Sequence, residues 1–253
     1  MKIAMMQPTF LPWQGFFGLV NAADLFIYLD DFQISIQSYH QRNRLFLNSD
    51  QVDWFTVPIK KSLSFGRPLN SAVINYELPW QKKILARIQH NYSKSIFYKE
   101  IYTLLESSML QKHASLADLN ISLINSVLLA MKWEKKTILS SQLTVTGDKS
   151  MRVLNILKKC DATQYFCAHG SFQYMYEERV FPVSGIETLF QDYLSTPYSQ
   201  IGSTGQFFSN LSIWDALFNV GPEKTSQLIV AGSKHWKTWP EMVSNFEGQI
   251  IAP

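Results

Sequence analysis

The sequence predicts an α/β protein with a Rossmann-like parallel sheet and an additional helical lobe. The chain opens with a strand–helix–strand pattern, and strand-like and helical segments alternate again from residue 134 onward. Between these parts, residues 80–133 show helical periodicity only. We therefore expect residues 1–79 and 134–253 to form the α/β domain, with 80–133 inserted as a helical lobe. One continuous domain is the alternative.

The opening unit predicts the first parallel strand pair. Lys2–Met6 is a short apolar run, 13–22 has apolar residues spaced as on one helix face, and 25–29 is a second apolar run. A unit of this size suits a right-handed crossover between parallel strands. Residues 7–15, which carry two prolines, then form the turn between strand and helix, where α/β sheets bind ligands.

The next segment, up to residue 79, reads as short strands and loops. Residues 44–47 and 53–59 predict strands joined by a turn at 48–50, because Asn, Ser and Asp favour turns. We expect a loop at 62–69, which contains a glycine and a proline, and a further short strand at 72–76.

The rest of the chain returns to alternation after three helices. Ser115 and Asp118 have the spacing of a helix start, and Gly221-Pro222 interrupts the last helical pattern. The expected helices are 80–91, 96–112, 116–133, Lys149–Lys159, 171–178, 213–220 and 223–230, and the expected strands are Thr137–Leu139, Gln164–Cys167 and 186–190.

Composition argues against several classes of partner. The net charge is +3 with no long Lys/Arg block, so we expect no nucleic-acid partner. No apolar run approaches the roughly 18 residues of a membrane span. The two cysteines, Cys160 and Cys167, match neither a zinc pattern nor a disulfide framework and read as buried thiols of a reducing compartment. We expect a cytoplasmic protein, and no metal site is predicted.

Polar residues stand where the first two strands end. Gln7 follows the first strand, and Asp30 and Asp31 follow the second, with Gln33 close behind. Adjacent residues on a strand point to opposite sides, so one aspartate is expected to face the cleft. A cleft aspartate could bind Mg²⁺, hold a ribose hydroxyl or take a proton from an amine, and turn formation is the structural alternative.

The segment Y-H-Q-R-N-R, residues 39–44, concentrates hydrogen-bond donors. Arg42 and Arg44 are two residues apart, so an extended chain presents both on one face. Two guanidinium groups on one face suit a phosphate or pyrophosphate, and Asn43 and His40 add neutral hydrogen-bonding groups. A strand edge protected by charge is the alternative.

A third cluster is Ala168-His169-Gly170-Ser171, at another junction between strand and helix. The backbone N–H groups of Gly170 and Ser171 at a helix start offer an anion site, and His169 could be an acid, a base, a donor or a structural residue. Further on, the polar residues of 210–221 can be explained as helix start and stop signals.

In combination, these motifs resemble the WbqC-like family. The resemblance rests on M-Q-P-T-F-L-P-W-Q-G-F-F, A-D-L-F-I-Y-L-D-D-F-Q, Q-R-N-R, W-F-T-V-P-I, the Tyr198-x-Gln200 pair and L-S-I-W-D-A-L-F-N-V-G, between residues 3 and 222. It implies a bacterial cytoplasmic protein associated with O-antigen (lipopolysaccharide) and other surface-polysaccharide biosynthesis.

A weaker resemblance is to nucleotidylyl transferases such as pantothenate synthetase, which begin with a similar strand, turn and helix. If Gly15 matches the glycine of their H-x-G-H motif, Trp13 and Phe16 replace the two histidines. Imidazoles stabilise charge on a transferring phosphate, and Trp and Phe cannot do so. The resemblance therefore implies the fold rather than adenylation.

The function expected from residues and resemblance together is that of a transferase. It would attach an acyl or aminoacyl group to the amine of a nucleotide-linked amino sugar, with a nucleotide sugar or other small anion as partner. The residues do not identify a cofactor; ATP or another activated acyl donor is the candidate, and a homo-oligomer is compatible with the chain. The alternative is a non-catalytic binding or assembly protein of the same pathway, docking through Trp236 and Trp239. The expected catalytic residues are Asp30, Asp31 and His169, and the expected substrate-binding residues are Gln7, Gln33, Arg42, Asn43, Arg44, Gly170, Ser171, Tyr198 and Gln200.

Overall fold

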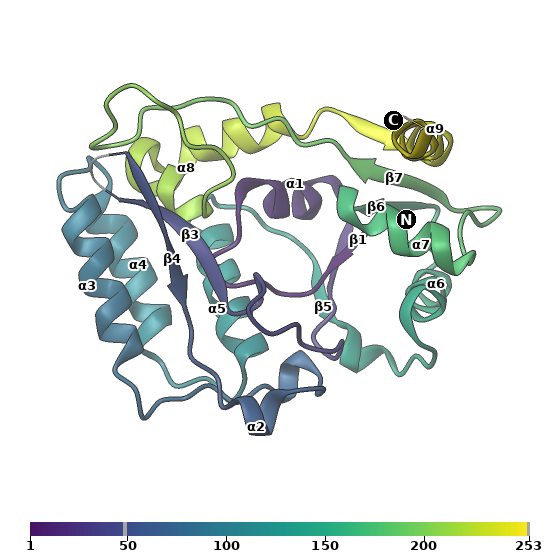
Figure 1. Cartoon of the computed structure of the whole chain (residues 1–253), viewed down its shortest axis with the longest axis horizontal. Coiled ribbons are helices and arrows are strands. Elements are labelled where there is room, and N and C mark those ends of the chain that lie inside the picture. Colours follow the sequence, from purple (N-terminus) through teal and green to yellow (C-terminus); the bar gives the residue numbers. More distant parts are fainter. Residues whose placement is uncertain (48–49, 252–253) are drawn as a thin grey trace.

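A six-stranded sheet forms the centre of the molecule. The computed structural model describes residues 1–47 and 50–251 (Figure 1). The sheet order is β5-β2-β1-β6-β7-β8, with every neighbouring pair parallel except β7 and β8. Its strands are β1 (Lys2–Met6), β2 (Leu25–Tyr28), β5 (Thr137–Leu139), β6 (Gln164–Cys167), β7 (Glu187–Gln191) and β8 (Trp236–Thr238). This mostly parallel sheet confirms the Rossmann-like α/β class.

The strand order creates a topological switch point between β1 and β6. The chain runs outward from β1 to β2 and β5, returns to the centre at β6 and continues outward to β7. Connections on the two sides of this point therefore diverge, which leaves a crevice outside the carboxyl ends of β1 and β6.

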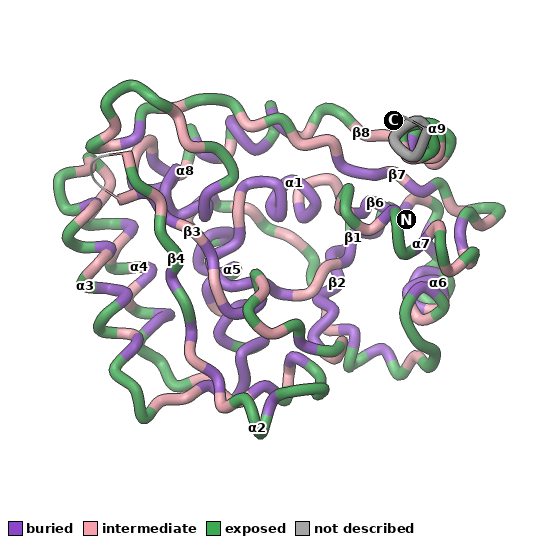
Figure 2. Tube along the Cα trace, viewed as in Figure 1, coloured by how far each residue is buried: buried purple, intermediate pink, exposed green. Residues whose placement is uncertain are grey.

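Helices cover both faces of the sheet because the central strands are apolar on both sides. Ala4 and Phe26 face a core shared with α1 (Gln14–Ala22) and α8 (Ile213–Gly232). Ile3 and Ile27 face the opposite core, which is shared with α6 (Lys149–Lys159), α7 (Phe172–Glu178) and α9 (Trp239–Ile251). In Figure 2 the buried positions (purple) accordingly follow α1 and β7.

A long segment between β2 and β5 adds a hairpin and several helices. The hairpin pairs β3 (Arg42–Leu47) with β4 (Gln51–Thr56) and forms no ladder with the central sheet. The helices are α2 (Lys61–Ser64), α3 (Trp80–Tyr92), α4 (Tyr98–Leu110) and α5 (Leu116–Ala130). Of these, α3, α4 and α5 share their core with α1 and α8, and the division into an α/β domain and an inserted lobe stays a prediction.

The structure corrects several predicted elements. The loop expected at 62–69 contains most of α2, and the strand expected at 72–76 is reduced to one bridge between Ile59 and Ile74. The expected hairpin turn at 48–50 falls partly on residues 48–49, outside the described residues. By contrast, the two helices expected at 213–220 and 223–230 are confirmed: they are the two parts of α8, divided at Gly221, whose backbone is not helical (φ 75°, ψ 172°).

The two tryptophans near the C-terminus pack inward. Trp236 contacts the ring of Phe166 edge-on at 4.7 Å, and Trp239 packs against Phe172 and Phe190. Both are half-buried in β8 and the start of α9. Their main contacts are therefore internal, and they do not form the exposed docking surface expected from the sequence.

Candidate functional site

A pocket of about 490 Å³ opens at the carboxyl ends of β1, β2 and β6. We call it the strand-end pocket. Gln7 and Thr9 line it from the segment after β1, Leu29 from the end of β2, and Ala168 and Ser171 from the segment after β6. It therefore occupies the crevice at the switch point, where open α/β sheets bind their ligands.

Gln7 lies in the wall of this pocket, at the end of β1 as expected. Its Nε2 donates to the backbone carbonyl of Gln33 at 3.0 Å. The Gln33 side chain is exposed and is not part of the pocket wall, so Gln33 contributes its backbone only. One N–H of the Gln7 amide is left for a ligand.

The loop after Gln7 is held by a buried asparagine on α5. Asn120 is fully buried, and its Nδ2 donates to the carbonyl of Pro8 at 2.9 Å and to that of His40 at 2.8 Å. Pro8 has no backbone N–H to donate, and its carbonyl is held by the Asn120 side chain. Asn120 thereby fixes two walls of the strand-end pocket relative to each other.

His40, expected as a neutral hydrogen-bonding group beside Arg42 and Arg44, lines the strand-end pocket instead. Its Nδ1 accepts a hydrogen bond from the backbone N–H of Ser35 at 3.1 Å, so the ring proton of the neutral form sits on Nε2. Burial lowers the pKa of His40 to about 4. The imidazole is therefore neutral at pH 7, and within the described residues its Nε2–H has no partner. It lines the strand-end pocket as an uncharged donor.

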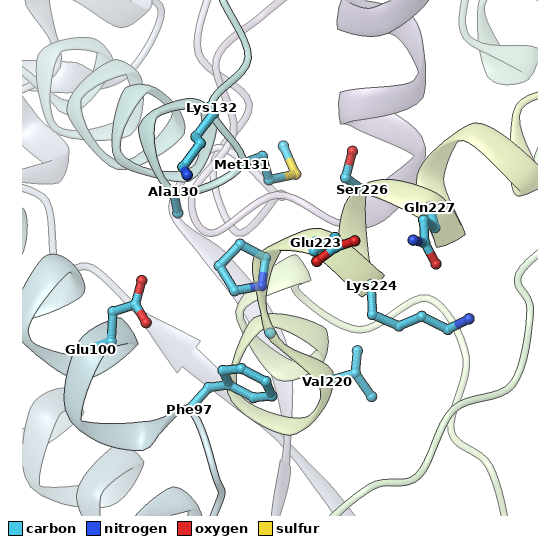
Figure 3. Close-up of a pocket in the computed structure, with 12 residues that line it drawn as sticks. Phe97, Glu100, Ala130, Met131, Lys132, Val220, Glu223, Lys224, Ser226 and Gln227 are labelled. Carbon is cyan, nitrogen blue, oxygen red and sulfur yellow. The ribbon is translucent and has the colours of Figure 1, made fainter.

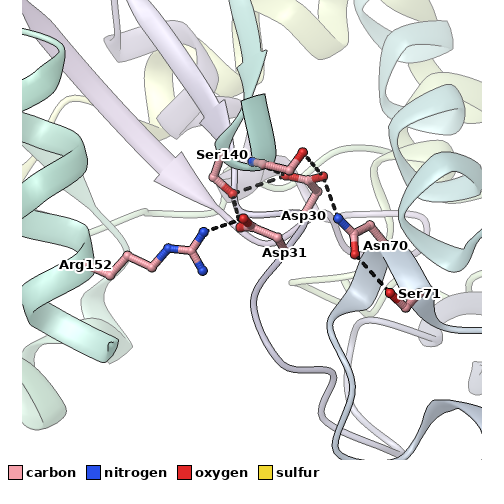
Figure 4. Close-up of polar contacts among 7 residues, drawn as sticks. Asp30, Asp31, Asn70, Ser71, Ser140 and Arg152 are labelled. Carbon is pink, nitrogen blue, oxygen red and sulfur yellow. Dashed lines mark hydrogen bonds and ion pairs between the residues drawn. The ribbon is translucent and has the colours of Figure 1, made fainter. Parts of the chain in front are cut away.

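Asp30 is buried among donors rather than presented to the pocket. Its carboxylate accepts from the Ser141 backbone N–H at 3.0 Å, the Ser141 hydroxyl at 2.7 Å and Asn70 Nδ2 at 3.1 Å (Figure 4). The Ser140 hydroxyl lies 3.2 Å away. These contacts tie the end of β2 to the turns after β5 and before α3.

Asp31 shares this cluster. It accepts from the Ser140 hydroxyl and forms an ion pair with Arg152 on α6 (Figure 4). Both aspartates lie beyond the end of β2, where side chains no longer alternate, so both reach Ser140 instead of pointing to opposite sides. Neither lines the strand-end pocket.

The segment after β6 reaches the pocket only in part. His169 and Gly170 are exposed on a short 3-10 turn and are not part of the pocket wall. Ser171 lines the pocket beside Tyr174, whose pKa is raised to about 12 by burial. Of the expected trio, Ser171 is the residue that a ligand in the strand-end pocket can touch.

Arg42 and Arg44 share one face of β3, as their spacing predicts. Their guanidinium carbons lie 4.4 Å and 5.8 Å from the ring centroid of Trp54, the cross-strand partner of Arg44. Within the described residues neither guanidinium forms an ion pair, and the Nε atom of each is buried without a partner. Two uncompensated cations side by side are suited to an anion.

A second pocket of about 350 Å³ adjoins this arginine pair, and we call it the hairpin pocket. Arg44, Tyr39, Trp13 and Asn210 line it, together with Met6 and Thr9. Met6 and Thr9 also line the strand-end pocket. The two pockets are therefore neighbours across the segment that follows β1.

Asn43 is structural although it touches the hairpin pocket. It is 1% exposed, and its Nδ2 donates to the carbonyls of Phe10 and Leu11 at 3.2 and 2.9 Å. Its Oδ1 accepts from the backbone N–H of Arg44 at 2.8 Å. Asn43 thus anchors the loop after β1 to the hairpin, and its side chain has little capacity left for a ligand.

Tyr198 and Gln200 belong to a separate buried network. The Tyr198 hydroxyl and Gln200 Nε2 donate to Asp215 Oδ2 at 2.6 and 2.8 Å, and the Tyr92 hydroxyl donates to Oδ1 at 2.6 Å. Asp215 is fully buried, and desolvation raises its pKa despite the three donors. These residues line neither of the two pockets above and join α8 to α3.

A larger hollow of about 820 Å³ lies at the kink of α8 (Figure 3). Phe97, Met131 and Pro222 form apolar walls, with Lys132 and Glu223 at the same hollow. It shares no lining residue with the two pockets above.

The structure thus brings together some of the expected residues and separates others. Gln7 and Ser171 meet in the strand-end pocket, and Asn43 and Arg44 meet in the adjoining hairpin pocket, with Arg42 beside them. Over residues 1–47 and 50–251, no three His, Cys, Asp or Glu side chains are grouped to hold a metal ion. None of the helices described has the length and apolar character needed to cross a membrane.

Fold and pocket together define a Rossmann-like α/β protein with a pocket at the switch point of its sheet. Residues 7–227 match the model of the WbqC-like protein family, and the chain belongs to this family. It is 30% identical over 229 residues to the uncharacterized protein Rv1507c of Mycobacterium tuberculosis (strain ATCC 25618 / H37Rv), covering 90% of this chain and 97% of that protein. No solved structure matches the chain.

Proposed function

We propose that the protein is a cytoplasmic transferase of bacterial surface-polysaccharide biosynthesis that acylates the amine of a nucleotide-linked amino sugar. The observation that carries the proposal is the pair of adjoining pockets. One is lined by Arg44 with Arg42 beside it, a pair of guanidinium groups suited to a diphosphate. The other lies at the switch point and offers the neutral donors Gln7 and His40 beside the Lys149–Glu178 ion pair.

The acyl transfer itself needs a positioned amine, an activated acyl donor and stabilisation of the developing oxyanion. The amine nitrogen bonds to the acyl carbonyl carbon, and the bond from that carbon to the leaving group of a thioester or acyl adenylate breaks. The leaving group departs with the bonding electrons, and the amine proton passes to solvent. His40 Nε2–H and the free N–H of Gln7 donate to the carbonyl oxygen as it becomes negative.

A neutral histidine is well suited to this role. Because its pKa is about 4, His40 donates a hydrogen bond without giving up a proton at pH 7. In this proposal His40 replaces His169, which is exposed outside the pocket, and Asp30 and Asp31 act by holding the pocket walls rather than as bases.

The test combines binding and turnover. Incubation of the protein with a UDP-linked amino sugar and either acetyl-CoA or an amino acid with ATP is expected to increase the mass of the nucleotide sugar by the acyl group. His40→Phe is expected to lower kcat about a hundredfold with a smaller change in the KM for the nucleotide sugar. The absence of transfer with a panel of amino sugars and donors would count against the proposal.

A further inference from the structure

We infer that the hairpin pocket binds the pyrimidine nucleoside of the nucleotide sugar. The diphosphate then lies across Arg42 and Arg44, and the sugar enters the strand-end pocket. The inference rests on the proposed function and adds to it the direction in which the substrate lies and the class of base that is bound.

The direction follows from where charge is left uncompensated. Arg44 lines the hairpin pocket, and Arg42 is beside it on the same face of β3, both held over Trp54. In the strand-end pocket, the lysine at the mouth, Lys149, already pairs with Glu178 at 3.5 Å. A diphosphate is therefore held better beside the hairpin than at the strand ends.

The hairpin pocket has aromatic walls that a base can stack on. Tyr39 is 49% exposed and leans on Trp54, with ring centroids 5.7 Å apart. Trp13 is held edge-on against Tyr193 at 5.1 Å and lies so close to Gly15 that a Cβ there would be 2.2 Å from the indole. An exposed tyrosine ring and a tryptophan held in place offer two aromatic surfaces for a planar base.

Two side chains of the hairpin pocket, Asn210 and Thr9, have a donor to offer, which favours a base that presents carbonyl oxygens. Asn210 Oδ1 already accepts from the Ser195 hydroxyl at 3.0 Å, which leaves its Nδ2 for a ligand. The Thr9 hydroxyl has no partner within the described residues and lines both pockets. Uracil and thymine each present two carbonyl oxygens, whereas adenine presents ring nitrogens beside an amino group that itself donates. Two donors in the pocket therefore fit uracil or thymine better, and we assign the pocket to a pyrimidine nucleoside diphosphate.

Isothermal titration with UDP and ADP, without any acyl donor, tests the inference. The wild-type protein is expected to bind UDP more tightly than ADP. Tyr39→Ala should weaken UDP binding about tenfold, while Tyr39→Phe should retain it because the ring still stacks. Asn210→Asp should remove most of the preference for UDP over ADP, since a carboxylate repels the base carbonyl.

The charge requirement has a matched control. Arg44→Ala and Arg42→Ala should each lower UDP affinity by at least about tenfold, whereas Arg67→Ala, which removes an exposed arginine outside both pockets, should leave it unchanged. Thermal unfolding of each variant verifies that it is folded. The inference is wrong if UDP affinity survives Tyr39→Ala and both arginine variants, or if UDP and ADP bind equally to the wild type.

A strand-end variant separates this inference from the proposed function. Ala168→Leu narrows the strand-end pocket and should leave UDP binding intact while weakening binding of the UDP-linked amino sugar. Loss of UDP binding in Ala168→Leu would place the nucleoside at the strand ends and overturn the inference. UDP binding at the hairpin with no transfer to any amino sugar would overturn the proposed function and leave the inference standing.

Discussion

Two charged clusters of this molecule differ in how the fold treats them. Asp30 and Asp31 are surrounded by hydroxyl, amide and guanidinium donors, so the protein satisfies their charge itself. Arg42 and Arg44 stack on Trp54 and form no ion pair in the described part of the chain. Removing one partner of an internally compensated charge destabilises the fold, whereas a charge left uncompensated is available to a ligand.

The largest expected effect is on the compensated side. Asp30→Ala leaves the Ser141 N–H and the Asn70 amide without an acceptor, so the free energy of unfolding should fall by about 4 kcal/mol. Urea denaturation followed by circular dichroism measures it. Glu134→Ala, which removes an exposed carboxylate, should change stability little. If Asp30→Ala unfolds with the same free energy as the wild type, the fold does not depend on the compensated aspartates.

Acid should destabilise the protein through His40. The pKa of His40 falls from 6.5 to about 4 on folding, so between these values the unfolded chain binds a proton that the folded protein does not. The free energy of unfolding therefore decreases as pH falls from 6.5 to 4, by about 3 kcal/mol from this residue. Urea denaturation across this pH range measures the decrease. In His40→Gln, which has no imidazole to protonate, the decrease should be smaller by about 3 kcal/mol. An identical pH dependence in wild type and variant would show that His40 does not titrate this way.

Two arginines make the comparison sharper because the same substitution should act differently on each. Arg152→Ala removes the partner of Asp31, and both side chains are mostly buried (20% and 17% exposed). The free energy of unfolding should fall by about 2 kcal/mol, and UDP affinity should not change. Chemical denaturation and titration of the same preparation provide both values. A loss of UDP affinity in a folded Arg152→Ala protein would assign that arginine to the ligand instead.

The smallest effect on stability is expected for the uncompensated pair. Arg42→Ala removes the repulsion between Arg42 and Arg44 and also loses the stacking of the Arg42 guanidinium on Trp54. Because these two effects oppose each other, the free energy of unfolding should change by no more than about 0.5 kcal/mol. The midpoint of urea denaturation measures it. A loss as large as that in Arg152→Ala would mean that the fold does depend on Arg42.

Much of the fold could be predicted from local patterns. Buried strands such as Lys2–Met6 and helices such as Lys149–Lys159 carry clear periodicity, and the alternation of such elements defines the class. The short strand β8 was missed because three half-buried residues give a weak pattern. The helix α9, which follows it directly, was not predicted either. The strand expected at 72–76 failed because one bridge to Ile59 provides no ladder.

The site was harder to predict because its geometry depends on distant partners. The same-face placement of Arg42 and Arg44 follows from a spacing of two and was predicted. The state of Asp30 depends on Ser141, more than a hundred residues away, and Tyr198 reaches Tyr92 only through Asp215. For His40 the signal was its place in Y-H-Q-R-N-R, but its burial and its bond to Ser35 are not visible in the sequence.

The segment after β1 separates the two pockets. The side-chain amides of Asn43 and Asn120 donate hydrogen bonds to its backbone carbonyls, and its prolines restrict its conformation. Because this segment is held in place, the strand-end pocket and the hairpin pocket stay at a fixed distance from each other. Under the proposal made above, a ligand that lies across both pockets must have a linkage whose length matches this fixed separation.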